Sequence, residues 1–172
     1  QAVDPNHDPA SANNTALGGR ITGNVISLTA KNDINNLGGQ ILGTQTDGQD
    51  TSQAYLSAGR DINVATTTQS TRNDTRNGAG VGTLSTRTAI DQVGTIQAGN
   101  VAMFAGRDLT IAGASVSATS GNLILSADRN VTLATVQTAQ SEAIVWDAKN
   151  SRSQSNSQEM GTTITGAGSL VI

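Results

Sequence analysis

Residues 57–99 recur 69 positions later as residues 126–168, and this internal repeat constrains the fold more than any other feature of the chain. A shorter copy lies inside it, because residues 99–111 recur 22 positions on as residues 121–133. A unit of about 22 residues that repeats at a fixed period and alternates apolar with polar side chains is typical of a β-solenoid. The positions that keep their residue type across the longer offset are Ser57, Ala58, Arg60, Ala65, Thr66 and Gly99.

Within one copy the apolar side chains alternate with polar ones, and glycine-containing corners separate the alternating runs. This pattern predicts three short strands per coil and parallel pairing between coils. Right-handed winding is the strong default for parallel crossovers. We therefore expect an all-β fold, a right-handed parallel β-helix with about 20–23 residues per coil and two excursions outside the helix. The side chains expected to point inward include Val101, Met103, Ala105, Leu109, Ile111, Leu123, Leu125, Ala127, Val131 and Leu133.

The first third of the chain carries a shorter repeat, in which residues 16–23 recur 20 positions later as residues 36–43. The change of period indicates two repeat types joined in one continuous rod. The expected divisions are a flexible N-terminal segment over residues 1–15 and a single β-helical rod over residues 16–172, with the first repeat type over 16–53 and the second over 54–172.

Composition favours a narrow core over a globular one. Only 35% of the residues are hydrophobic, and three are aromatic, namely Tyr55, Phe104 and Trp146, whereas a compact domain draws much of its burial from rings. The net charge of −3 gives no general attraction to nucleic acid or to anionic membranes. The sequence contains no cysteine, which removes disulfides, thiolate metal sites and cysteine nucleophiles together.

Two polar segments interrupt the coils at matching places in the 69-residue repeat, about residues 67–92 and about residues 138–159. We expect them to leave the same corner of the rod as loops or hairpins and to pack beside each other. The Ser-rich run over residues 151–157 is expected at the tip of the second excursion. Binding residues concentrate on loops carried by a rigid scaffold. The candidate binding residues are therefore Arg72, Arg76 and Arg87 on the first excursion and Trp146 on the second.

Trp146 allows two interpretations. In the first, an exposed ring on an excursion stacks on a sugar or contacts membrane lipid. In the second, the ring folds back as a plug over one side of a coil. We favour the plug, because an excursion of this length otherwise lacks an anchor.

A search for catalytic and metal-binding groups is mostly negative, and we expect no catalytic residue, no metal site and no cofactor. His7 is the only histidine, and one imidazole in a terminal segment makes no triad by sequence alone. The nonapeptide of calcium-binding solenoids is absent from the sequence. Four polar residues occupy the same corner position in successive repeats. We interpret them as a stacked ladder that forms turns, in preference to a catalytic pair of carboxylates. The ladder comprises Asp33, Asp61, Asp108 and Asn130, with Arg60, Arg107 and Arg129 on the outside.

These motifs resemble a known family. Residues 96–111, 126–133 and 161–164 are similar to the second haemagglutinin-repeat region of filamentous haemagglutinins and contact-dependent growth-inhibition exoproteins. Residues 16–43 are similar to the first, Leu-Gly-Gly-rich repeat type of that family. The resemblance covers about residues 16–172. It implies a β-helical shaft in a large exoprotein of Gram-negative bacteria, exported by two-partner secretion through an outer-membrane transporter and located at the cell surface.

The resemblance also implies the partners: neighbouring repeats of the same polypeptide, the outer-membrane transporter during export, and a host or target-cell surface, with no nucleic acid among them. Adhesins and toxin carriers of this family both contain such shafts. The sequence is therefore compatible with a full-length protein of either kind. The leading hypothesis is a non-catalytic structural shaft. The alternatives are a glycan or receptor-binding module that acts through the polar excursions and, third, a polysaccharide-cleaving β-helix enzyme. Dispersed acidic residues and few aromatic rings disfavour the enzyme.

Overall fold

The computed structural model describes residues 18–45, 48 and 50–172, and every regular element in that part of the chain is a β-strand. The all-β prediction is therefore confirmed. The flexible segment expected over residues 1–15 lies outside the described residues. The strands, β1 to β18, form three parallel sheets and one antiparallel sheet.

We call the parallel sheets A, B and C. Sheet A consists of β1 (Arg20–Gly23), β4 (Gln40–Gly43), β9 (Thr95–Ala98), β12 (Ser115–Ala118) and β17 (Thr163–Gly166). Sheet B consists of β2 (Val25–Ala30), β5 (Gln53–Ala58), β10 (Asn100–Ala105), β13 (Leu123–Ala127) and β18 (Leu170–Val171). Sheet C consists of β3 (Ile34–Leu37), β6 (Ile62–Ala65), β11 (Asp108–Ala112) and β14 (Asn130–Ala134).

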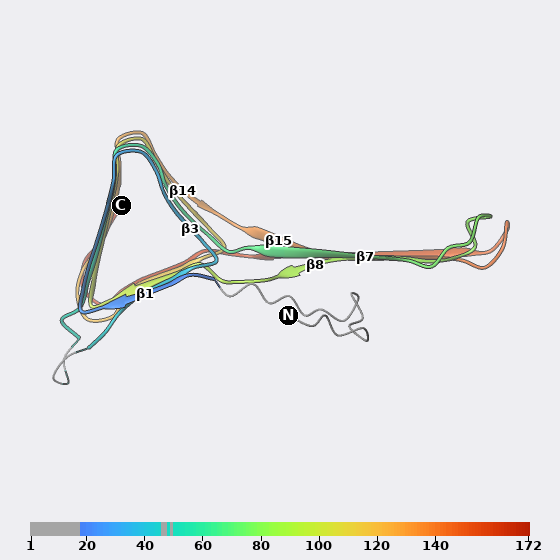
Figure 1. Ribbon diagram of the computed structural model, residues 1–172, viewed down its shortest axis with the longest axis horizontal. Helices are drawn as coiled ribbons and strands as arrows, with labels where there is room; N and C mark the ends of the chain where they lie inside the picture. The colour runs from blue at the N-terminus through green and yellow to red at the C-terminus, as the bar shows by residue number, and fades with distance from the viewer. Residues whose placement is uncertain (1–17, 46–47, 49) are drawn as a thin grey trace, which may run out of the picture.

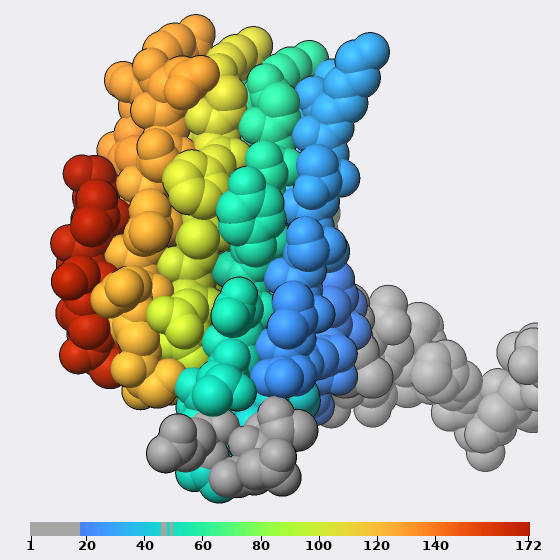
Figure 2. All heavy atoms as spheres, turned by 90° about the vertical axis from the view of Figure 1, so that its left-hand side faces the viewer, coloured from blue at the N-terminus to red at the C-terminus, as the bar shows by residue number. Residues whose placement is uncertain are grey.

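The chain visits these sheets in a fixed order. β1, β2 and β3 lie in sheets A, B and C, and β4, β5 and β6 repeat that order one strand further along each sheet. We call one passage through A, B and C a circuit; β17 and β18 belong to the fifth. The three sheets form the sides of a triangle (Figure 1), and the strands of sheet B lie side by side in chain order (Figure 2). We call this three-sided part the body.

Strand register matches the repeat periods read from the sequence. β1 pairs with β4 across 20 positions, and β10 pairs with β13 across 22. Residues 69 positions apart lie two circuits apart, because Ser57 and Ser126 both pair with Phe104. Other spacings exceed the expected 20–23 residues. β2 with β5 and β3 with β6 pair across 28 positions, since the connection from β4 to β5 is longer than the other connections between sheets A and B. Strands separated by a hairpin pair across longer spacings, such as the 47 positions between β5 and β10.

Inward-facing aliphatic side chains from the three sheets meet in one core. Seven of the ten side chains expected to point inward are buried, and Ala127 and Val131 pack against the core while partly exposed. Leu133 was expected inward and is 49% exposed, because β14 is the last strand of sheet C and no further strand covers it. The aromatic residues lie outside this buried set. The rings of Tyr55 and Phe104 contact each other, with centroids 5.5 Å apart.

The corner between sheets C and A alternates between two forms along the body. In the first and third circuits it is a tight turn at Gly38 and Gly113, whose φ angles of 63° and 54° lie in the left-handed region. In the second and fourth circuits the chain leaves this corner as a hairpin before it returns to sheet A. A Cβ on Gly38 would lie 2.7 Å from Gln92 Cβ, and one on Gly113 would lie 2.7 Å from Val136 Cγ2. Glycine is therefore needed where a tight turn meets the base of a hairpin.

The two hairpins pair into one antiparallel sheet, which we call the hairpin sheet. β7 (Thr68–Asp74) pairs with β8 (Gly82–Ile90), and β15 (Val136–Val145) pairs with β16 (Ser151–Met160). β8 and β15 also pair with each other, so the excursions leave the same corner and lie side by side, as expected. The hairpin sheet extends away from one corner of the triangle (Figure 1).

The Ser-rich run was expected at the tip of the second hairpin, and that expectation is wrong. Residues 151–157 belong to β16, where each pairs with a residue of β15. The tip is formed by residues 146–150. Pairing with β15 gives this polar segment its strand structure, since backbone hydrogen bonding to a neighbouring strand does not require apolar side chains.

Leu125 tests the core. Its side chain is 1% exposed, and Leu125→Asp would place an unpaired carboxylate among stacked aliphatic side chains. We expect the free energy of unfolding to fall by about 3–5 kcal/mol, measured by urea denaturation. Ser126→Asp is the matched control, because Ser126 is exposed on the same strand and should tolerate the change. Equal stability of the two variants would contradict the inward assignment.

Gly113 tests the alternating corner. Gly113→Ala forces a Cβ into a left-handed turn against Val136 and should cost about 1–3 kcal/mol, seen as a lower melting temperature. Gly78→Ala is the control, since Gly78 lies in the turn of the first hairpin with nothing within 4 Å of its added Cβ. If both variants have the same melting temperature as the parent chain, the tight turn does not constrain the corner.

Candidate interaction surface on the paired hairpins

An Asx side chain organises each hairpin tip. In the first hairpin, Asn77 Oδ1 accepts hydrogen bonds from the amides of Ala79 and Val81, both at 3.0 Å. In the second, Asp147 Oδ1 accepts from the amides of Lys149 and Asn150 at 2.7 and 2.9 Å. The Asn150 side chain and the Lys149 amide hold the pKa of Asp147 below its usual range. Such local side-chain to backbone bonds define both turns.

Two of the three candidate arginines are paired within their own hairpin. Arg76 binds Asp74 through two nitrogens, Nε to Oδ1 at 2.8 Å and Nη2 to Oδ2 at 2.6 Å. Arg72 adds a third contact to the same carboxylate at 3.1 Å. The hydrogen bonds from Arg76, joined by Arg72, hold the pKa of Asp74 well below its usual range. Because one carboxylate offsets two guanidinium groups, this cluster is less cationic than the sequence suggested.

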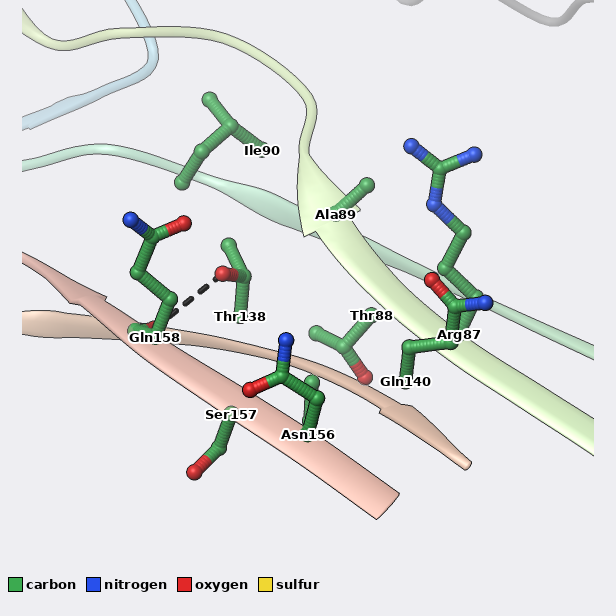
Figure 3. A pocket seen from close by; sticks show the side chains of 10 residues that line it. Arg87, Thr88, Ala89, Ile90, Thr138, Gln140, Asn156, Ser157 and Gln158 are labelled. Carbon is green, nitrogen blue, oxygen red and sulfur yellow. Dashed lines mark hydrogen bonds between the residues drawn. The ribbon is translucent and has the colours of Figure 1, made fainter. Parts of the chain in front are cut away.

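Arg87 occupies a different part of the hairpin sheet. It is exposed on β8, where Gln140 lies opposite it on β15, and Asn156 lies opposite Gln140 on β16. Within the described residues it forms no salt bridge. Arg87 and these amides line a shallow pocket of about 290 Å³ with Thr138 and Gln158 (Figure 3). The polar lining offers hydrogen bonds but little apolar surface to enclose a ligand.

Trp146 lies at the end of the second hairpin, directly after β15, with 57% of its surface exposed. The plug interpretation is therefore wrong: the ring does not fold back over a coil, because the strand pairing of β15 carries it away from the body. The ring borders an open pocket lined also by Asp147, Lys149, Asn150 and Ser151.

The four candidate residues do not form one site. Arg76 and Trp146 lie at the turns of the two hairpins, and Arg72 precedes the first turn. Arg87 lies further toward the body, opposite Gln140 on β15. The sequence placed these residues on excursions, but it could not show how far along a strand each one lies.

The two faces of the hairpin sheet differ in side-chain size, which the sequence analysis missed. Directly paired residues share a face, and one face carries mostly small side chains. The hydroxyl groups of Thr86 and Ser141 form a hydrogen bond of 2.7 Å between the hairpins. Those of Ser70 and Thr88 form one of 2.8 Å within the first hairpin. The other face carries the longer amides and Arg87. Small and longer side chains mostly alternate along β15 and β16. This two-residue alternation in the sequence could have revealed the difference between the faces.

The expected polar ladder runs along the corner before sheet C. The amide of Asp61 donates to Asp33 Oδ1 at 3.2 Å, and the amide of Asp108 donates to Asp61 Oδ1 at 3.3 Å. Each of these carboxylates also forms a salt bridge with an arginine of the following circuit. The three salt bridges are Arg60–Asp33, Arg107–Asp61 and Arg129–Asp108. These carboxylates therefore link adjacent circuits.

A second polar cluster, which the sequence analysis missed, joins the corner between sheets A and B. Ser52 is fully buried, and its Oγ accepts a hydrogen bond from the Gly99 amide at 2.8 Å. Asp50 accepts hydrogen bonds from the hydroxyls of Ser52 and Thr119. These two bonds hold the pKa of Asp50 below its usual range. Asp50 and Thr119 belong to different circuits, so no local sequence pattern could have paired them.

No group of three or more His, Cys, Asp and Glu residues that could hold a metal ion occurs among the residues the structure describes. The same residues contain no helix that could span a bilayer. His7 lies outside the described residues.

Comparison with known proteins adds no relative: no family model, no curated protein and no solved structure matches the chain. The resemblance to haemagglutinin-repeat regions stays a prediction from the motifs.

The corner ladder predicts a pH dependence of stability. The hydrogen bonds from Arg129, and then from Asn130, lower the pKa of Asp108 in the folded chain. A carboxyl whose pKa is lower in the folded than in the unfolded state contributes its full stability above the unfolded pKa of about 3.9 and loses it as the pH falls through the folded pKa. We therefore expect the free energy of unfolding to fall as the pH drops below about 4.

Asp108→Asn should make this acid dependence shallower, as measured by urea denaturation at a series of pH values. Asp128→Asn is the control, since Asp128 is exposed and forms no salt bridge within the described residues. An identical pH dependence in the Asp108→Asn variant and the parent would contradict the role of the ladder.

Proposed function

We propose that the chain is a segment of a right-handed parallel β-helical shaft in a large secreted exoprotein of the bacterial cell surface. The observation that carries the proposal is the fixed order in which the chain visits sheets A, B and C, with each strand in register with its equivalent one circuit away. Parallel crossovers are right-handed in nearly all proteins, which supports the hand. A fold built from repeated circuits becomes longer when further circuits are added, so the number of circuits sets the length of the shaft.

The exposed apolar side chains support neighbouring repeats as partners. Most of the large exposed hydrophobic residues lie on the outermost strands of the body: Ile21, Val25 and Leu37 on β1 to β3, Leu133 on β14, and Leu170 and Val171 on β18. A further circuit stacked on either end would bury them, at roughly 25 cal/mol for each Å² of apolar surface. Such ends suit extension by repeats of the same polypeptide better than exposure to water.

The proposed shaft is not an enzyme. The carboxylates of Asp33, Asp61 and Asp108 each bind an arginine at the corner ladder, whereas glycoside hydrolysis needs two carboxyl groups that flank one cleft. The family resemblance supports export through an outer-membrane transporter by two-partner secretion and a location at the cell surface. A shaft of this kind would present a distal adhesive or toxic domain to a host or target cell.

Tandem duplication tests the shaft. Residues 95–162 contain two circuits and the second hairpin, and they can be inserted repeatedly after Thr162. Each inserted unit should lengthen the body by about 9.6 Å, because two strand spacings are added to every parallel sheet. Four units should therefore add about 38 Å, measured by negative-stain electron microscopy. Arrays that fold as separate globules, or whose length does not grow with unit number, would contradict the proposal.

A second function, glycan or receptor binding, is favoured by one observation. The Trp146 ring lies exposed at the end of a hairpin that extends away from the body. Binding to a glycan array, weakened at least about tenfold by Trp146→Ala, would support it, with Tyr55→Ala as a control for loss of an exposed ring on the body. A chain that binds no glycan, or a Trp146→Ala variant that binds as the parent does, would exclude this role for Trp146.

A further inference from the structure

The hairpins occur at every second corner between sheets C and A. The first follows β6 in the second circuit and the second follows β14 in the fourth, so two circuits separate them. Their order in the hairpin sheet, β7, β8, β15 and β16, follows the order of the circuits. The hairpin sheet therefore grows in the same direction as the body.

The two growth rates are equal. Neighbouring strands in a sheet lie about 4.8 Å apart, so two circuits advance the body by about 9.6 Å. One hairpin contributes two strands, which occupy the same distance of about 9.6 Å in an antiparallel sheet. A hairpin at every corner would need twice the available space, and a hairpin at every third circuit or beyond would leave a gap.

The pairing of β8 with β15 shows this match. Seven residue pairs join the two hairpins, from Ala139 opposite Thr88 to Val145 opposite Gly82. A hydroxyl hydrogen bond between Thr86 and Ser141 adds a side-chain contact. Residues in this contact are more than 50 positions apart, and the intervening circuits place the hairpins at strand-pairing distance.

The outer edge of β16 is unpaired among the described residues. β16 is a ten-residue strand, and nine of its residues are exposed. Edge strands that must avoid pairing carry lysines, prolines or bulges. The sequence of β16 contains no lysine and no proline, and its charged residues, Arg152 and Glu159, lie near its two ends.

We propose that the outer edge of β16 receives the first strand of a further hairpin that leaves the same corner one repeat unit later, so that successive hairpins form one continuous antiparallel sheet along the shaft. The proposal rests on the proposed shaft. The partner is a polar strand that runs in the direction of β15, from the body outward, because that direction makes it antiparallel to β16. The hairpin sheet would then brace the shaft along its length.

A separate second copy of the chain does not fit this edge in the same way. Its own outward strands, β7 and β15, follow two and four circuits of its own body. Pairing its β7 with β16 would place its first circuit in the space that the fifth circuit of the first copy occupies. A hairpin supplied by the same polypeptide avoids this overlap.

An engineered disulfide tests the proposal in the chain with one inserted copy of residues 95–162. The natural sequence has no cysteine, so two introduced thiols report on one contact. Carrying the register of Thr86 and Ser141 forward by one repeat unit places Ser155 of the first β16 opposite Ser141 of the inserted copy. We expect Ser155→Cys in β16 and Ser141→Cys in the inserted hairpin to form an intramolecular disulfide under mild oxidation.

The control keeps the inserted Ser141→Cys and moves the other cysteine to Ser70 on β7, at the far edge of the sheet; it should stay reduced. A folded, longer chain whose Ser155→Cys thiol stays reduced, or links two molecules instead of one, would overturn the continuous sheet and leave the shaft intact. A chain with the insertion that does not fold or lengthen would overturn the shaft and this inference together.

Discussion

In-register stacking of each strand on its equivalent one circuit away is the interaction on which the rest of the structure depends. It aligns the aliphatic side chains of sheets A, B and C into a single core. It also brings Asp33, Asp61 and Asp108 to the same corner, where each carboxylate reaches the circuit that follows. Because the parallel strand pairs of the body link neighbouring circuits, such a fold gains stability by length and needs no large globular core.

The alternation of tight turns and hairpins follows from this stacking. A hairpin base fills more space than one strand spacing allows, and Gly38 and Gly113 supply the room in the neighbouring circuits, since a Cβ at either position would overlap the hairpin base. The 69-residue repeat in the sequence is therefore two circuits plus one hairpin. Two circuits for each hairpin also place successive hairpins at the strand spacing of an antiparallel sheet. The body and the hairpin sheet therefore lengthen by the same distance with each repeat.

Much of this arrangement could be predicted from the sequence, because period and alternation encode it directly. The offsets of 20 and 22 residues gave the correct register for β1 with β4 and for β10 with β13. Features that depend on strand ends or on distant partners could not be predicted. Leu133 follows the inward pattern but lacks a covering strand. Trp146 lies at a turn set by the length of β15, and Asp50 meets Thr119 only because two circuits stack.

A disulfide within sheet C measures the stacking most directly. Asn63 pairs with Thr110 in the adjacent circuit, and Thr110 pairs with Thr132 in the circuit beyond. Cysteines that form disulfides have Cα atoms within about 7 Å, which one strand spacing of about 4.8 Å satisfies and two spacings do not. Asn63→Cys with Thr110→Cys should oxidise readily in the folded chain, and Asn63→Cys with Thr132→Cys should stay reduced. Equal oxidation of the two pairs, or oxidation of the second pair alone, would contradict the in-register stack.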